Sequence, residues 1–143
     1  MGILLDFDDL LNHVLVEEFD AEYKAAVAVV QNKDRWLLGL STSEDDRKNR
    51  WVCPGGGIKP GESVKKAAAR EAWEETGVRC RAVGEPFSLP GKKGVAFVHC
   101  KVTGDPDLNS NHEFSALGFF TVRELRSLKL YKNVRDLIQR VQR

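Results

Sequence analysis

One stretch constrains this chain more than any other: residues 56 to 78, which read Gly-Gly-Ile-Lys-Pro-Gly-Glu-Ser-Val-Lys-Lys-Ala-Ala-Ala-Arg-Glu-Ala-Trp-Glu-Glu-Thr-Gly-Val. The part from Pro54 to Gly61 is rich in glycine and proline, which predicts turn structure. From Ser63 the sequence predicts a helix, because Glu62 and Ser63 can start one and a run of three alanines favours it. Gly77 lies where such a helix would end.

Three carboxylates share one side of this predicted helix. At about 100° per residue, Glu71, Glu74 and Glu75 lie on one arc. The other side is predicted to pack on the core: Ala69, Ala72 and Trp73. Like charges at this spacing repel each other, and Arg70 alone cannot neutralise three of them. A hard divalent cation such as Mg²⁺ can, because proteins hold it with carboxylates and substrate phosphate oxygens.

The same residues follow a specific spacing: Gly56, five residues, Glu62, seven residues, then Arg70-Glu71-Ala72-Trp73-Glu74-Glu75-Thr76-Gly77-Val78. This resembles the box of the Nudix family, Gly-x5-Glu-x7-Arg-Glu-U-x-Glu-Glu-x-Gly-U, where U is a bulky aliphatic residue. Every polar and glycine position matches, and Ala72 is a smaller aliphatic residue than usual. Three glutamates alone would suit a solvated helix face. The glycine loop, Glu62 and Arg70 in register favour the catalytic interpretation.

Apolar patterning along the rest of the chain predicts the other elements. Strands are expected at 24–30, 35–40, 51–53, 95–102 and 117–121, with irregular strand over 79–85 and 86–89. Helical spacing is expected at 3–19 and 134–141, with a short helical turn from 122. The helix at 3–19 either covers part of the core or joins a second subunit, so a homodimer is a further prediction.

The order of these elements is also similar to the Nudix fold, over about residues 22–142. The resemblance implies an α/β/α sandwich with a mixed β-sheet and a loop-helix-loop catalytic motif at 56–78. We expect one domain over residues 1–143, in which residues 1–21 form a helical extension outside the family pattern.

The resemblance also implies a chemistry. Nudix enzymes hydrolyse a nucleoside diphosphate linked to another group, by attack of water on a phosphorus of the pyrophosphate; divalent metals mask its charge and lower the pKa of bound water. The implied metal ligands are Glu71, Glu74 and Glu75, with a backbone oxygen from the glycine loop at Gly56, and Mg²⁺ is the expected cofactor, for which Mn²⁺ can substitute. Arg70 is expected to orient Glu71. Glu62 is expected either to support the metal site through water or to hold Arg70.

A further acid often completes such a site. Glu113 stands just before the last predicted strand and is the candidate extra ligand or general base. A solvated loop carboxylate is the alternative for Glu113. Glu85 is a weaker rival, and Glu71 would serve as the base if neither acts. His112 is expected to be a surface histidine.

The substrate is less constrained. The run Trp51-x-x-Pro54-Gly55-Gly56-Gly57-x-x-Pro60 is similar to that of diphosphoinositol and diadenosine polyphosphate hydrolases. Substrate-binding cations are predicted in two loops, although each is also an ordinary surface charge: Arg47, Arg50, Lys92 and Lys93. Ala116-Leu117-Gly118 stands where an inositol enzyme would need basic residues. We therefore expect a phosphorylated small molecule of the nucleoside triphosphate or dinucleoside polyphosphate type. The alternatives are a diphosphoinositol polyphosphate hydrolase and an RNA-cap or nucleotide-binding module.

Composition bounds the partners. With 42% hydrophobic residues, 30% charged residues and a net charge of +1, the chain has no general attraction to nucleic acid or membranes. Three widely spaced cysteines support neither a disulfide framework nor a zinc site, which favours a reducing cytoplasm. No signal peptide or membrane-length apolar run is recognised. Residues 1–22 are acidic and 121–143 basic, so these ends are expected to attract each other.

Overall fold

The computed structural model describes residues 23–109 and 113–142; the predicted helix at 3–19 and His112 lie outside them. A seven-stranded sheet forms the centre, in the order β3–β2–β1–β6–β5, while β4 pairs with β1 and β7 pairs with β2. Strands β1 and β6 are parallel and the other pairs antiparallel, so the sheet is mixed as predicted. The strands are β1 (Ala25–Asn32), β2 (Arg35–Ser41), β3 (Trp51–Val52), β4 (Gly55–Gly57), β5 (Cys80–Ala82), β6 (Val95–Val102) and β7 (Phe114–Thr121).

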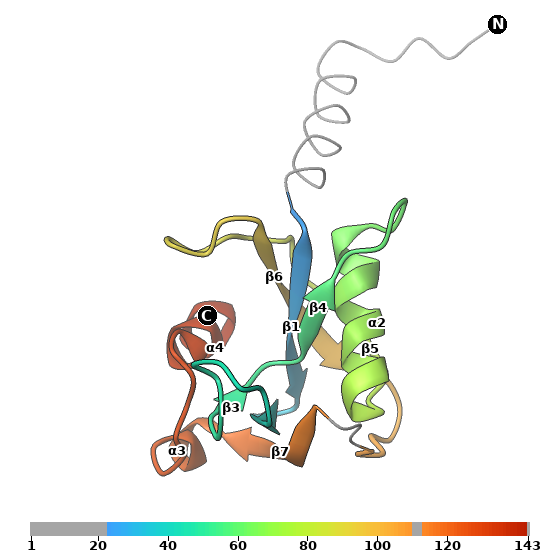
Figure 1. Cartoon of the computed structure of the whole chain (residues 1–143). Helices are drawn as coiled ribbons and strands as arrows, with labels where there is room; N and C mark the ends of the chain where they lie inside the picture. The colour runs from blue at the N-terminus through green and yellow to red at the C-terminus, as the bar shows by residue number, and fades with distance from the viewer. Residues whose placement is uncertain (1–22, 110–112, 143) are drawn as a thin grey trace, which may run out of the picture.

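Helices cover both faces of this sheet (Figure 1). Helix α2 (Val64–Thr76) packs on one face, and α4 (Val134–Gln142), preceded by the short α3 (Val122–Leu125), packs on the other. Side chains of β1 alternate between the two cores: Ala26, Ala28 and Val30 face α2, whereas Val27 and Val29 face α4. The result is the predicted α/β/α sandwich. None of the helices in these described ranges is long and apolar enough to cross a membrane.

Local sequence signals determine the ends of α2. Ser63 caps its start, because its hydroxyl accepts a hydrogen bond from the backbone N–H of Lys66. Gly77 ends it in the left-handed conformation, with φ of 77°, and its N–H donates to the carbonyl of Trp73. Both ends were predicted correctly.

Three sequence predictions need correction. The glycine run is not only a turn, because Gly55–Gly57 form strand β4 against Ala25–Val27 of β1. A Cβ on Gly55 would lie 2.7 Å from the carbonyl oxygen of Ala26, so the close pairing requires glycine there.

Trp73 was predicted to pack on the core, but its side chain is 48% exposed and lies under the guanidinium of Arg79, 5.3 Å from the ring centroid. The buried stripe of α2 instead includes Glu75.

The third correction concerns residues 79–89, which were predicted to be irregular strand. Between 79 and 89 only Cys80–Ala82 form a strand, followed by a single bridge from Phe87 to Phe97. Pro86 lacks the N–H that a continued ladder needs.

Candidate active site

Arg70 organises the polar face of α2. Its Nε and Nη2 donate to Glu62 Oε2 and Oε1 at 2.7 and 2.9 Å, and Nη2 also donates to the carbonyl of Gly57 at 2.9 Å. Its Nη1 donates to Glu71 Oε1 and to Glu74 Oε2, each at 3.0 Å. The Arg70 and Glu62 side chains are only 18% and 15% exposed, so this two-point ion pair is well shielded.

The pKa values of this pair agree with the geometry. Hydrogen bonding to Arg70 lowers the pKa of Glu62 to about 2, and Glu62 in turn raises the pKa of Arg70. Of the two predicted placements of Glu62, the structure therefore has the one in which it holds Arg70. Because the same guanidinium contacts Glu71, Glu62 helps to fix the direction of that carboxylate.

Gly56 forms a cradle for the carboxylate of Glu71. A Cβ at position 56 would lie 2.6 to 2.7 Å from all three atoms of this carboxylate, which is closer than a Cβ atom comes to atoms it is not bonded to. Strand β4 is therefore in direct contact with the polar side of α2. The glycine loop and the glutamate helix, which the sequence prediction places in one motif, are therefore in direct contact.

Glu75 lies at the inner end of this site. The residue is 4% exposed, and its carboxylate accepts a hydrogen bond from the N–H of Gly55 at 3.2 Å. Burial raises the pKa of Glu75 to about 9; the negative charge of Glu113 and the contact with Glu71 raise it too, against the effect of Gly55. Glu113, which precedes β7, therefore lies close enough to Glu75 to repel it. A small polar cavity of about 40 Å³ has both carboxylates in its lining.

In the described residues the side chains predicted to bind the metal do not converge on one position. Among residues 23–109 and 113–142, no three acidic, histidine or cysteine side chains are arranged to hold one ion. Glu74 contacts Arg70 at the exposed side of α2, whereas Glu75 is buried beside Gly55. The donor set nevertheless suits a hard cation, because Glu75 is buried and the carboxylates of Glu113 and Glu71 each lie close enough to it to raise its pKa further.

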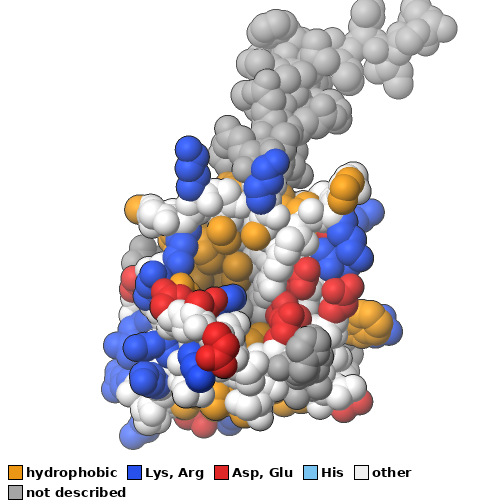
Figure 2. All heavy atoms as spheres, in the orientation of Figure 1, with side chains coloured by type: hydrophobic (Ala, Val, Ile, Leu, Met, Phe, Trp, Pro, Cys, Tyr) orange, Lys and Arg blue, Asp and Glu red, His pale blue; other side chains and the backbone are white. Residues whose placement is uncertain are grey.

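A cavity of about 370 Å³ opens beside the glycine strand. Its floor is apolar and comes from β1, β6 and α4, including Val27, Phe97 and Leu137, while Gly55 and Gly56 form its inner wall. The space-filling view shows hydrophobic side chains at the bottom of a hollow and acidic side chains on its α2 side (Figure 2). This volume is in the range of pockets that bind small molecules, about 300–1,000 Å³.

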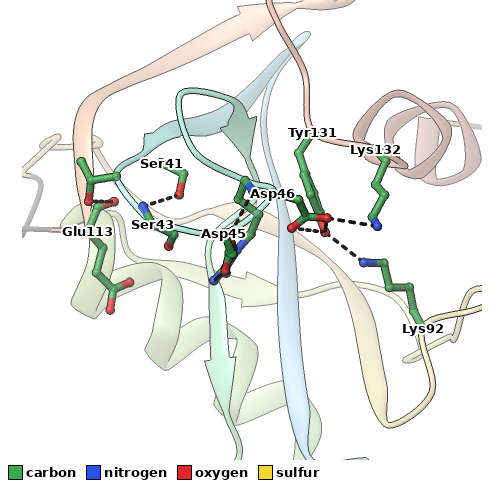
Figure 3. Close-up of polar contacts among 10 residues, drawn as sticks. Ser41, Ser43, Asp45, Asp46, Lys92, Glu113, Tyr131 and Lys132 are labelled. Carbon is green, nitrogen blue, oxygen red and sulfur yellow. Dashed lines mark hydrogen bonds and ion pairs between the residues drawn. The ribbon is translucent and has the colours of Figure 1, made fainter.

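Charged residues from three loops meet at the mouth of this cavity (Figure 3). Lys92 donates to the hydroxyl of Tyr131 at 3.2 Å, and that hydroxyl contacts both oxygens of Asp46 at 3.2 and 3.4 Å. Lys132 pairs with Asp46 at 3.1 Å. At the mouth the negative charge of Asp46 is therefore balanced by Lys132, and Lys92 contacts the phenol of Tyr131.

The four predicted substrate-binding cations differ in position. Arg47 and Lys92 line the large cavity, and Arg47 is held by Asp45 through contacts of 2.6 to 3.1 Å. Arg50 and Lys93 are not part of its lining. Glu85, the predicted rival of Glu113, pairs with Lys65 at the first turn of α2 and is 84% exposed.

Sequence reasoning missed Asp46 and Tyr131. Two acidic residues are followed by two basic residues at 45–48, and this pattern indicates that neighbouring acids partly neutralise the cations. No comparable signal identifies Tyr131, because its position depends on how the segment before α4 crosses the cavity mouth.

Comparisons with known proteins bear on the family and on the fold. The family model described as NUDIX domain matches residues 22–141. The Caenorhabditis elegans protein named nudix hydrolase 1 is 30% identical in an alignment of 129 residues that covers 85% of this chain and 35% of that protein. A Roseobacter denitrificans protein named RNA pyrophosphohydrolase is 36% identical in an alignment of 76 residues that covers 48% of each chain. The chain thus spans about a third to a half of the length of these two relatives.

Among solved structures, the fold is similar to that of a C. elegans Ap4A hydrolase in a binary complex. The TM-score is 0.66 at 22% sequence identity, over 83% of this chain and 96% of that chain. This likeness concerns the fold, including the mixed sheet between two helical layers.

Proposed function

Because this chain belongs to the Nudix family, we propose that it hydrolyses the pyrophosphate linkage of a nucleoside diphosphate joined to another group. The observation that carries the proposal is the junction of β4 and α2. There the Glu71 carboxylate lies on Gly56, Arg70 holds it at 3.0 Å, and Glu75 is buried 3.2 Å from the Gly55 N–H. This junction opens directly onto a cavity large enough for a small molecule.

Each residue of the junction has a proposed task. Glu62 and the Gly57 carbonyl fix the Arg70 guanidinium, which then holds Glu71 in one orientation. Glu113 is proposed as the general base that accepts a proton from the attacking water, since it lies at the rim of the small polar cavity that it shares with Glu75. Arg70 and Glu71 lie within helix α2, while Glu62 and Glu113 lie just before α2 and β7, so regular elements support the direction of each side chain.

A divalent cation, Mg²⁺ or Mn²⁺, is proposed as the cofactor. Glu71 and Glu75 would hold it, with Glu74 or Glu113 as a further oxygen donor and a backbone oxygen of the glycine strand near Gly56. Such an ion neutralises phosphate charge and makes water more acidic. Burial of Glu75 among other carboxylates supports this assignment, because a cation would relieve the repulsion that raises its pKa.

The apolar floor of the large cavity favours a substrate whose second group is a planar, weakly charged ring, as in a nucleoside. The mouth is close to neutral, because Asp45 pairs with Arg47 and Asp46 with Lys132. A diphosphoinositol polyphosphate carries many phosphates and would need a strongly basic cavity. We therefore propose a nucleoside triphosphate or a dinucleoside polyphosphate as the substrate, with Lys92 contacting one of its phosphates.

RNA with a pyrophosphate linkage at its end is the second candidate. The observation in its favour is the relative named RNA pyrophosphohydrolase, whose similarity covers about half of this chain. Such a substrate shares the same reacting group, so the two candidates use the same junction of β4 and α2. The two candidates differ in the part of the substrate that would extend beyond the large cavity.

A hydrolysis screen tests the proposal. The protein is incubated with Mg²⁺, with Mn²⁺ or with chelator, and with ordinary and oxidised nucleoside triphosphates, diadenosine tetraphosphate, nucleotide sugars, diphosphoinositols and 5′-triphosphorylated RNA. Glu71→Gln should abolish metal-dependent turnover, whereas Glu85→Gln, a matched change on an exposed residue paired with Lys65, should leave it at the parent rate. Full turnover in chelator, or an active Glu71→Gln variant, would contradict the proposal.

A further inference from the structure

The direction of Glu113 is set by contacts from the end of β2. The carbonyl oxygen of Glu113 accepts two hydrogen bonds from Thr42, one from the backbone N–H at 3.1 Å and one from the side-chain hydroxyl at 3.0 Å. Thr42 directly follows β2. Two donors on one acceptor define both the position and the tilt of that peptide group.

A β-bulge lies next to this contact. Leu40 pairs with Ala116, but Ser41 pairs with Phe114, so Ser115 is an extra residue in β7. A bulge of this kind bends the strand and changes the direction of nearby side chains, and bulges often lie beside functional sites. Here the bulge is two residues from Glu113.

The ring of Phe114 fixes the same segment from the other side. A Cβ on Gly39 would lie 2.6 to 2.8 Å from atoms of this ring, so the ring lies directly on β2 and Phe114 is 7% exposed. Between this packed ring and the two bonds from Thr42, the backbone of Glu113 has little freedom. Its side chain extends toward α2 (Figure 3), in agreement with its effect on the pKa of Glu75.

We infer that Thr42 is a positioning residue for the reaction: its hydroxyl holds the Glu113 peptide so that the Glu113 carboxylate faces the junction of β4 and α2. This inference rests on the proposed role of Glu113. Glu113 itself is exposed, and burial of its own side chain does not fix it. The two hydrogen bonds from Thr42 support its orientation through the backbone.

The test replaces Thr42 by Val, which keeps the shape and removes the hydroxyl, and by Ser, which keeps the hydroxyl. With Mg²⁺ and whichever of ATP and diadenosine tetraphosphate is turned over faster, Thr42→Val should lower kcat about tenfold with KM within about twofold. The expected loss is smaller than the roughly hundredfold cost of a 1 Å displacement, because the N–H bond remains. Thr42→Ser should restore most of kcat. Thr103→Val, an exposed threonine away from this contact, should leave kcat unchanged.

A double-mutant cycle with Glu113→Gln decides whether Thr42 acts through Glu113. Once the carboxylate is absent, Thr42→Val should have no further effect on kcat. An equal loss in both backgrounds would overturn the inference, as would a Thr42→Val variant with the parent kcat. If Glu113→Gln itself has the parent kcat, the proposed role of Glu113 fails, and this inference fails with it.

Discussion

Replacing Gly56 by Ala tests whether the glycine strand and the glutamate helix work as one site. The new Cβ would lie 2.6 Å from Cδ and Oε1 of Glu71 and 2.7 Å from Oε2. Ordinary contacts of a Cβ begin at 3.4 Å, so the carboxylate has to move by close to 1 Å. Arg70 holds that carboxylate at 3.0 Å, and the Glu71 side chain is only 13% exposed, so it cannot simply swing into solvent.

The consequences for stability and for turnover should differ. The backbone at position 56 has no positive φ, and its pairing with Ala26 uses main-chain atoms, so alanine is compatible with strand β4. We expect the free energy of unfolding to fall by about 1 kcal/mol, which is typical of a single substitution. A displacement of about 1 Å in a catalytic group costs roughly a hundredfold in rate, so kcat should fall by about that factor.

Gly57→Ala is the matched control, because a Cβ at position 57 would have no atom within 4 Å. Both variants are compared with the parent in a Mg²⁺-dependent hydrolysis assay and in urea unfolding. The reasoning predicts a slow but folded Gly56→Ala variant and an unaffected Gly57→Ala variant. Equal kcat for Gly56→Ala and the parent would refute it, and equal losses in both variants would show that the strand, rather than the Glu71 carboxylate, is what matters.

Three more predictions concern charge. Glu74→Gln should lower kcat at least about a hundredfold, the scale for a single electrostatic stabiliser, with an unchanged circular dichroism spectrum; a near-parent rate would make this side chain a surface group. In the metal-free protein the raised pKa of Glu75, about 9, means that the folded state binds more protons than the unfolded state from about pH 4.5 to 9, so stability should fall as pH rises across that range. Urea unfolding should show this slope in the parent and not in Glu75→Gln, and equal slopes would contradict it. Lys92→Gln should raise KM several-fold while Lys93→Gln, outside the cavity lining, should not; equal KM values would remove Lys92 from substrate binding.

Sequence alone predicts the elements of this fold where the signal is local. Ser63 and Gly77 mark the ends of α2 because capping depends on neighbouring residues. Both ends of the strand at Val95–Val102 were predicted correctly, because a mainly apolar run between two glycines favours a strand. The N-terminal helical extension, the dimer and the cytoplasmic location remain predictions.

Non-local contacts explain what the sequence could not predict. The three consecutive glycines form a strand because β1 lies beside them; a side chain at position 55 would meet β1 and one at position 56 would meet Glu71, whereas position 57 is open. Trp73 was assigned to the core from its helical phase, but the phase of α2 is set by which side meets the sheet, and that side includes Glu75. The bulge at Ser115 and the contact from Thr42 to Glu113 join segments 71 residues apart, which no window of sequence reveals.

The charge balance of α2 supports the proposal of a bound cation. Sequence reasoning held that one arginine cannot neutralise three glutamates, and Arg70 does divide its donors among Glu62, Glu71 and Glu74. In the described part of the chain it forms no ion pair with Glu75, whose main hydrogen-bond donor is the Gly55 N–H. The carboxyl group that receives no contact from Arg70 therefore lies at the buried end of the helix, beside the glycine strand that lines the large cavity, and its raised pKa of about 9 keeps it protonated at neutral pH in the metal-free protein. A divalent ion bound there would bring its positive charge to the point where a pyrophosphate entering from the cavity first reaches α2.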